Sequence, residues 1–214
     1  MKKRLILLGP PGAGKGTVGG RLGETLELPL VSSGDLLREN LKKGTEAGIK
    51  AKQYMEKGEL VPDEIVIAMI EEELSKPSCD RGAILDGFPR TLSQAQMLDG
   101  LFECGDDVKV VYLKADDDFL VNRLSKRRVC DGCGKIYHLV NLPPEKEGLC
   151  DVCGGKLVQR NDDREEIIRR RLNVYRKMTA PLIEYYGKRN VLHIVPGDGK
   201  LEDTLDEIRR IVKW

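Results

Sequence analysis

The sequence predicts an α/β fold of three layers, in which a five-stranded parallel sheet is covered by helices on both faces. Two observations lead to this prediction. Short runs of Leu, Ile and Val alternate along the chain with longer segments whose apolar residues have helical spacing. The runs Leu5–Leu8 and Val108–Leu113 are almost continuously apolar, as expected for strands that are buried on both faces.

The expected strands are short and rich in Leu or β-branched residues: Arg4–Leu8, Leu28–Val31, Ala83–Leu85, Val108–Leu113 and Val191–Val195. The expected helices lie between them: Gly14–Glu27, Pro62–Leu74, Asp116–Ser125, Arg164–Tyr186 and Leu201–Val212. Pro62 followed by Asp63 suits a helix N-terminus, because proline fits the first turn and an acidic side chain complements the helix dipole. In the long Arg164–Tyr186 segment, the residues expected to face the core are Ile167, Ile168, Leu172 and Tyr175.

Two stretches do not fit this alternation, so we predict a core with two insertions. Residues 32–61 read as short, charged helical pieces interrupted by Gly34, Gly44, Gly48 and Gly58. Residues 126–163 carry two cysteine pairs, a Pro143-Pro144 break and few large apolar side chains. The core then comprises residues 1–31, 62–125 and 164–214.

The composition limits the classes of function that the protein can have. The chain has 214 residues, 40% of them hydrophobic, and its 36 Lys and Arg against 35 Asp and Glu leave a net charge of +1. This argues against disorder and gives no electrostatic reason to expect nucleic acid or an anionic membrane as a partner. The four apolar residues Leu5–Leu8 are too few for a signal peptide, which needs about 7–15. We therefore expect a cytoplasmic protein.

The segment Gly9–Thr17, with the sequence GPPGAGKGT, follows the first strand and opens the first helix. It is a close variant of the phosphate-binding loop, with Gly16 inserted before the hydroxyl residue. Glycine lets the backbone approach phosphate oxygens, and the helix N-terminus attracts the anion. Lys15 supplies a mobile positive charge, and Thr17 is the expected magnesium-side hydroxyl. The loop predicts nucleotide binding without deciding the reaction.

Three motifs in order along the chain resemble the adenylate kinase family: Gly9–Thr17, then SSGDLLR at Ser32–Arg38, then LDGFPR at Leu85–Arg90 with Gln94. Lys126-Arg127-Arg128, Asp162-Asp163 and Arg171 extend the likeness over the whole chain. The resemblance implies a P-loop nucleotide kinase fold with a helical AMP-binding insertion and a zinc-stapled lid. It also implies reversible transfer of a phosphoryl group from Mg-ATP to AMP, giving two ADP. We expect a monomer.

The resemblance also implies roles for individual residues. On the ATP side it implies Gly12, Ala13, Gly14, Lys15, Gly16, Thr17, Arg123, Arg127, Ile136, Tyr137 and, by a loose alignment, Lys200. On the AMP side it implies Ser33, Arg38, Glu59, Leu60, Val61, Gly87, Phe88, Pro89, Arg90 and Gln94. Arg160 and Arg171 match arginines that reach the phosphates, and with Lys15, Arg90 and Arg127 they form the expected catalytic set. Ser33 departs from the family pattern, in which Thr is common.

Carboxylates complete the expected site. Asp86 ends a strand at the sheet edge that holds the phosphate loop, where an acidic residue typically holds magnesium, often through water. Asp162 and Asp163 are interpreted as caps of the helix that follows, with some electrostatic role; pairing with lid arginines is the alternative. No general base is needed, because the attacking AMP phosphate oxygen is already ionised, so His138 and His193 are expected to be packing or surface residues.

The pairs Cys130-x2-Cys133 and Cys150-x2-Cys153 indicate one zinc ion, since four thiolates fit its tetrahedral geometry. Four cysteine ligands leave no open position, so the metal is expected to be structural. Two disulfides are the alternative, which a reduced cytoplasm disfavours. Cys79 and Cys104 lie outside the pattern and are expected to be ordinary thiols.

Other classes of protein share part of this sequence pattern. A GTP:AMP phosphotransferase shares the long lid, whereas UMP/CMP kinases typically have a short one. A zinc-ribbon module that binds nucleic acid, attached to an NTPase, would explain Lys126-Arg127-Arg128 beside the cysteines. Acidic and basic residues nearly balance in 126–163, however, and four zinc-bound thiolates would add negative charge there, which is a poor match for a polyanion.

Overall fold

The computed structural model describes residues 1–214, and a parallel sheet of five strands lies at its centre. The strands follow the spatial order β2-β3-β1-β4-β8. Their bounds are β1 Lys3–Leu8, β2 Leu30–Ser32, β3 Gly82–Asp86, β4 Asp107–Lys114 and β8 Leu192–Pro196. The predicted α/β fold is confirmed, and each of the five predicted strands is present with ends that shift by no more than two residues.

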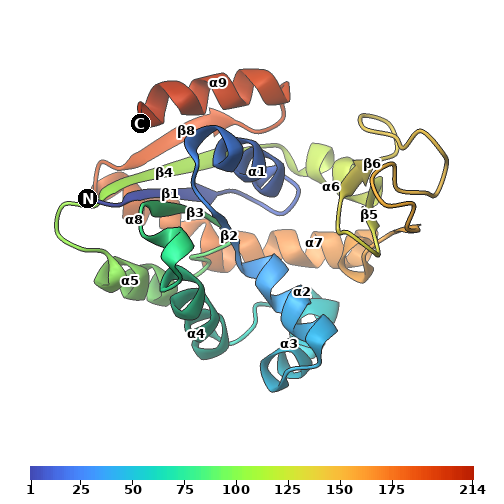
Figure 1. Ribbon diagram of the computed structural model, residues 1–214, viewed down its shortest axis with the longest axis horizontal. Coiled ribbons are helices and arrows are strands. Elements are labelled where there is room, and N and C mark those ends of the chain that lie inside the picture. The colour runs from blue at the N-terminus through green and yellow to red at the C-terminus, as the bar shows by residue number, and fades with distance from the viewer.

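Helices cover both faces of the sheet (Figure 1). Helices α1 (Lys15–Leu26) and α9 (Leu201–Val212) lie on one side, and α4 (Asp63–Leu74), α5 (Leu92–Leu101) and α8 (Pro181–Lys188) on the other. The alternation of side chains along β1 divides the core accordingly. Leu5 and Leu7 pack with α1 and α9, whereas Ile6 and Leu8 pack with the opposite layer. Helix α5 was not predicted from the sequence.

The segment expected as one long helix is interrupted. Helix α7 (Glu165–Val174) passes through a π-helical turn at Tyr175–Thr179 before α8 begins at Pro181. Proline lacks the N–H that a continuous helix needs and fits only a first turn, so a new helix starts there. The predicted inner stripe is correct in its burial: Ile168 and Leu172 are in the core, and Ile167 and Tyr175 are half-buried.

Residues 32–61 form two helices, α2 (Ser33–Lys43) and α3 (Glu46–Lys57), which project from the sheet layer (Figure 1). Gly44 and Gly58 end these helices, as predicted, and both do so in the left-handed conformation. Gly48 does not interrupt a helix: it lies inside α3, where an added Cβ would come within 2.3 Å of the Asn40 carbonyl carbon. Glycine there allows α3 to pack closely on the end of α2. Gly34 likewise lies inside α2.

Helix α6 (Asp117–Ser125) leads into a second, smaller sheet. Its antiparallel strands have the order β6-β5-β7, with bounds β5 Arg127–Cys130, β6 Ile136–His138 and β7 Leu157–Val158. Short 3₁₀ turns occupy Pro77–Cys79 and Asn161–Asp163, and the second returns the chain to α7. None of the helices combines the length and apolar character that crossing a membrane requires.

Candidate functional site

A cleft of about 920 Å³ opens at the carboxyl ends of β1 and β3. Ligands of open parallel sheets bind at this edge. The segments that line the cleft include the loop after β1, helix α2 with the segment Gly58–Val61, the loop after β3, the small sheet from Gly134 to Leu142, and residues of α6 and α7. The cleft therefore brings together segments that lie far apart in the sequence.

The loop Gly9–Thr17 connects β1 to α1 and packs closely against neighbouring elements. Gly12 and Gly14 have φ of 90° and 94°, which favours glycine. A Cβ on Gly12 would lie 2.9 Å from the Leu124 side chain, and one on Gly14 would lie 3.1 Å from the Arg123 guanidinium. Helix α1 has no side-chain cap, so the N–H groups of its first turn are free to bind an anion.

Lys15 lies in this loop beside Asp86. Its Nζ donates hydrogen bonds to the carbonyl oxygens of Gly9 (2.7 Å) and Pro10 (3.0 Å). Burial lowers the pKa of Lys15 to about 8, although the nearby Asp86 carboxylate opposes this shift. Burial raises the pKa of Asp86, and Lys15 and Arg90 oppose that shift. The opposite charges of the two residues thus partly offset the effect of burial on each pKa.

Seven arginines line the cleft, Arg21 and the six that the sequence singled out: Arg38, Arg90, Arg123, Arg127, Arg160 and Arg171. Burial lowers the pKa of Arg90 to about 10, and the charge of Arg171 adds to this effect. Arg160 also has its pKa lowered to about 10, by burial and then by Arg38 and Arg127. These guanidinium groups repel one another, so the cleft is electrostatically suited to a polyanionic ligand.

The interpretation of Asp162 and Asp163 as helix caps is wrong. Helix α7 begins at Glu165 without a side-chain cap. The Asp163 carboxylate is fully buried and accepts hydrogen bonds from Arg127, and Asp162 forms an ion pair with Arg171 at 3.1 Å. Asp163 therefore holds Arg127 at the start of the small sheet, as in the alternative interpretation, whereas Asp162 holds Arg171 of the core helix α7.

Another wall of the cleft centres on the backbone of Gly87. Its carbonyl accepts hydrogen bonds from Ser33 Oγ at 2.6 Å and from Arg90 Nε at 2.7 Å. Arg38 pairs with Asp35 at 2.6 Å, and Glu59 pairs with Arg170. The loop after β3 and the first turn of α2 are thereby joined on one wall.

Gln94 lies on this wall with its amide held at both ends. Its Oε1 accepts from the Arg90 backbone N–H at 2.7 Å, and its Nε2 donates to Asp63 Oδ1 at 2.6 Å. Thr91 donates to the other oxygen of Asp63 at 2.9 Å and caps α5 by accepting from the Gln94 backbone N–H at 3.1 Å. The sequence reasoning missed this role for Asp63, because an acidic residue after Pro62 reads as an ordinary helix start.

Most of the predicted binding residues line the cleft, but three do not. Ala13 and Phe88 are buried in the two halves of the core. Lys200 is exposed at the start of α9, and the next residue, Leu201, lines the cleft instead. Of the two histidines, His138 lines the cleft, and its Nδ1 accepts from the backbone N–H groups of Val140 and Asn141.

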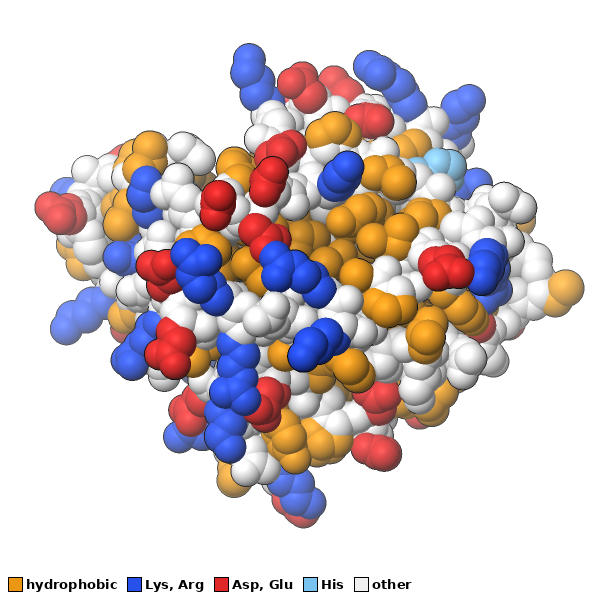
Figure 2. All heavy atoms as spheres, turned by 180° about the vertical axis from the view of Figure 1, so that it is seen from behind, with side chains coloured by type: hydrophobic (Ala, Val, Ile, Leu, Met, Phe, Trp, Pro, Cys, Tyr) orange, Lys and Arg blue, Asp and Glu red, His pale blue; other side chains and the backbone are white.

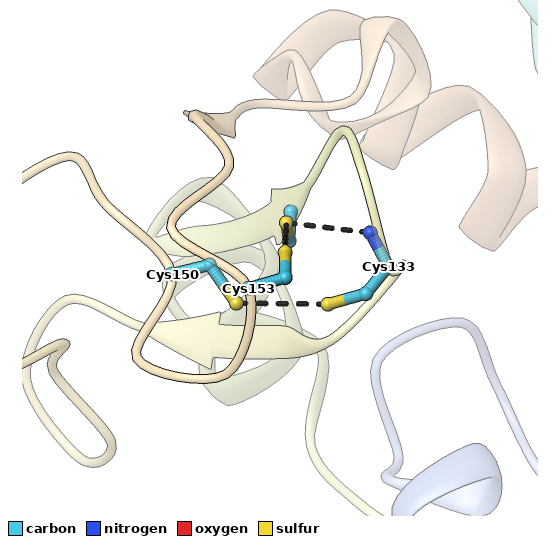
Figure 3. Close-up of side chains that lie close together, drawn as sticks. Cys133, Cys150 and Cys153 are labelled. Atoms are coloured by element: carbon cyan, nitrogen blue, oxygen red, sulfur yellow. Dashed lines mark hydrogen bonds between the residues drawn. The ribbon is translucent and has the colours of Figure 1, made fainter.

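The four paired cysteines come together in the small sheet, where their sulfur atoms all lie within 4.8 Å of one another (Figure 3). Cys130 and Cys153 have Sγ atoms 3.3 Å apart, and Cys133 and Cys150 have theirs 3.6 Å apart. A disulfide needs about 2.05 Å, whereas four thiolates at about 2.3 Å from a tetrahedral zinc ion lie about 3.8 Å apart. The donor set therefore fits zinc.

The Tyr137 side chain faces this sulfur cluster. Its hydroxyl lies 3.4 Å from Cys150 Sγ and accepts from the Asp151 backbone N–H at 2.8 Å. Tyr137 as a whole is 1% exposed and belongs to the apolar cluster around Cys130 and Cys150. Its exposed neighbour Ile136 is therefore the more accessible of the two to a ligand in the cleft. Cys79 is buried and Cys104 exposed, and neither belongs to the cluster.

A phosphate-binding loop at the end of a parallel sheet, facing an arginine-rich cleft under a small cysteine-rich sheet, defines a P-loop nucleotide phosphotransferase. The adenylate kinase family profile matches residues 7–191. The chain is 50% identical to an adenylate kinase of Caldicellulosiruptor bescii over 96% of both proteins. It is 49% identical to one of Archaeoglobus fulgidus over 98% of this chain and 97% of the relative, and 46% identical to one of Methanocella arvoryzae over 98% of both. The chain belongs to the adenylate kinase family, whose reaction is phosphoryl transfer between ATP and AMP.

Proposed function

We propose that the cleft carries out this reaction with Mg-ATP bound at the Gly9–Thr17 loop and AMP bound at the wall formed by Ser33, Gly87 and Gln94. A single observation carries the proposal: the two walls face one cleft, with Lys15, Asp86 and the arginines between them. Two anionic nucleotides bound there would direct their phosphates toward the same group of cations.

The donor side is the phosphate loop. The backbone from Gly12 to Thr17 and the start of α1 would bind the phosphates of ATP, and Lys15 would move from the Gly9 and Pro10 carbonyls to the β- and γ-phosphates. Arg123, which lies over Gly14, would contact the adenine or the adjoining phosphates. Ile136 and the Tyr137 backbone would cover ATP from the lid, and a backbone contact near Lys200 would reach its base.

Asp86 and Thr17 are the residues that would hold magnesium. No protein group donates a hydrogen bond to the Asp86 carboxylate, and an added Cβ on Gly16 would lie 3.2 Å from its Oδ2. A carboxylate oxygen without a hydrogen-bond donor therefore lies close against the loop, and hard oxygen ligands of this kind suit magnesium. The ion would supply positive charge to the phosphates of the donor.

On the acceptor side, Ser33, Arg38 and Gly87–Arg90 would bind the phosphate and ribose of AMP, and Gln94 its base. Glu59, Leu60 and Val61 would close the wall through their backbone and apolar atoms, since all three line the cleft. Phe88 would act from the core by fixing this loop. Ala13 would do the same for the phosphate loop.

Catalysis would depend on positioning and charge. The transferred phosphoryl group spreads negative charge over its oxygens, which planar guanidinium groups stabilise. Arg90, Arg127, Arg160 and Arg171 would converge on it with Lys15. No side chain has to accept a proton, because the attacking phosphate oxygen of AMP is already ionised. Excluding water from the cleft matters more than supplying a general base, since water would otherwise hydrolyse ATP.

Two mobile parts would exclude that water. We propose that residues 126–163 form a lid over ATP and 32–61 a flap over AMP, both moving on a core of 1–31, 62–125 and 164–214. Residues of both the proposed lid and the proposed flap line the cleft, which supports this division. One zinc ion held by Cys130, Cys133, Cys150 and Cys153 would staple the lid, which has little apolar core of its own. We further propose a cytoplasmic monomer.

A coupled assay for ADP tests the proposal. ATP with AMP should give two ADP for each ATP consumed, and omission of AMP should abolish turnover. Added RNA or DNA should have no effect. On the face shown in Figure 2, Lys and Arg side chains lie among Asp and Glu side chains and form no continuous positive surface. Turnover that nucleic acid stimulates and AMP does not would overturn the proposal.

A further inference from the structure

The amide of Gln94 is held in one orientation. A glutamine amide normally can exchange its oxygen and nitrogen by rotating half a turn about its last torsion. Here Oε1 faces the Arg90 backbone N–H, which can only donate, and Nε2 faces the Asp63 carboxylate, which as an ion can only accept. Rotation would place oxygen against oxygen and N–H against N–H. The partners thus decide which end of the amide is the donor.

The Asp63 carboxylate is itself held in position by its neighbours. It is the first residue of α4, where the helix N-terminus stabilises a carboxylate. Its second oxygen accepts from Thr91, whose hydroxyl also caps α5. Asp63 does not line the cleft, whereas Gln94 does, although only 1% of its surface is exposed. Among the residues that line the cleft, Gln94 is the one to which the Asp63 side chain is hydrogen-bonded.

The fixed amide retains one N–H and one oxygen lone pair for a ligand, in a fixed order. The Watson–Crick edge of adenine offers an acceptor at N1 beside a donor at N6, and the edges of hypoxanthine and guanine offer the reverse order. We propose that Asp63 is a positioning residue that makes the acceptor site select adenine over 6-oxopurines, by preventing Gln94 from rotating to pair with them. This inference rests on the proposed function, in which Gln94 contacts the base.

The variant Asp63→Asn tests the inference, because an asparagine amide can either donate to or accept from Gln94. We expect the ratio of kcat/KM for AMP to that for IMP to fall roughly tenfold or more, with GMP following IMP. The change should come mainly from KM. Asp99→Asn is the matched control: Asp99 lies on the same helix α5, accepts from Tyr185 and Arg189 instead of Gln94, and should keep the wild-type ratio.

A second measurement needs no variant. Purine riboside 5′-monophosphate keeps the N1 acceptor of AMP and lacks the 6-substituent, so the unaltered protein should use it better than IMP, whose order of donor and acceptor is reversed. If IMP is used as well as this analogue, or if Asp63→Asn lowers thermal stability and leaves the base ratio unchanged, the inference is overturned.

The outcomes also separate the inference from the function on which it rests. If Gln94→Leu changes the base ratio and Asp63→Asn does not, Gln94 reads the base without direction from Asp63, and only the inference fails. If the unaltered protein does not phosphorylate AMP at all, the proposed function and the inference both fail.

Discussion

The guanidinium of Arg127 donates two hydrogen bonds to the fully buried carboxylate of Asp163, from Nε at 2.8 Å and from Nη2 at 2.6 Å. Arg127 begins the small sheet, and Asp163 lies where the chain returns from it to α7. Arg171 of α7 also donates to Asp163, at 3.3 Å. One carboxylate therefore joins both ends of residues 126–163 to the core helix and orients two of the proposed catalytic arginines.

The substitution Asp163→Ala should destabilise the protein and lower its kcat. Removing one partner of a buried pair costs about 3–5 kcal/mol of unfolding free energy, which corresponds to a fall in Tm of roughly 10 °C for a chain of this size. Because Arg127 also loses its orientation, we expect kcat to fall about 10²-fold. Calorimetry and steady-state kinetics measure both effects.

Glu165→Ala is the control for that variant. Glu165 pairs with Arg169 on the exposed surface of α7, where ion pairs contribute little. The unfolding free energy of the Glu165→Ala protein should stay within about 0.5 kcal/mol of the wild-type value. An Asp163→Ala protein that behaves like Glu165→Ala would contradict the role given to the Arg127 pair.

Lys15→Met should reduce phosphoryl transfer by roughly 10²–10⁴-fold, because the loop loses the charge that would meet the β- and γ-phosphates. The far-ultraviolet circular dichroism spectrum should remain that of the wild type. Lys188→Met, which removes an exposed lysine paired with Glu184 on α8, should leave the rate unchanged. Retained turnover in Lys15→Met would show that the loop is not the catalytic cradle.

ATP binding should weaken above about pH 8, where Lys15 loses its proton. Its pKa lies below the ordinary value of 10.5, so the unfolded chain holds more protons between these two values. The contribution of Lys15 to unfolding free energy therefore rises with pH in that window while its contribution to binding is lost. Titration calorimetry at several pH values should show the loss for the wild type and a flat profile for Lys15→Arg.

Zinc removal should loosen the lid before the core. We expect about one zinc per chain, and a chelator should make residues 126–163 the first site of limited proteolysis. Cys133→Ser should lose the metal, whereas Cys104→Ser, which changes an exposed thiol outside the cluster, should keep it. Protein without zinc, in which all four clustered thiols titrate as free, would contradict the metal site.

Features encoded by neighbouring residues could be predicted from the sequence. The phosphate loop and the cysteine pairs each depend on spacing within a few residues, and the strands depend on short apolar runs. The structure brings Cys130 and Cys133 to Cys150 and Cys153 as that spacing predicts. The resemblance to a known family then supplied residues that no local pattern indicates, such as Arg160 and Arg171.

Polar pairs between distant residues could not be predicted in this way. Asp63 meets Gln94 across 31 positions, and Arg127 meets Asp163 across 36, and neither pair leaves a periodic signal in the sequence. Sequence rules for local structure also gave a wrong prediction where two of them applied to the same residues. Asp162 and Asp163 precede a helix and look like caps, but arginines that line the cleft bind them instead.

The central claim is that this cleft uses AMP as acceptor and ATP as donor, and a nucleotide panel tests it most directly. Initial rates should be measured with AMP, UMP, CMP and GMP against ATP, and with ATP and GTP against AMP. We predict the highest kcat/KM for ATP with AMP, with the other acceptors lower by orders of magnitude. Equal or faster phosphorylation of UMP or CMP, or preferred use of GTP as donor, would contradict the account.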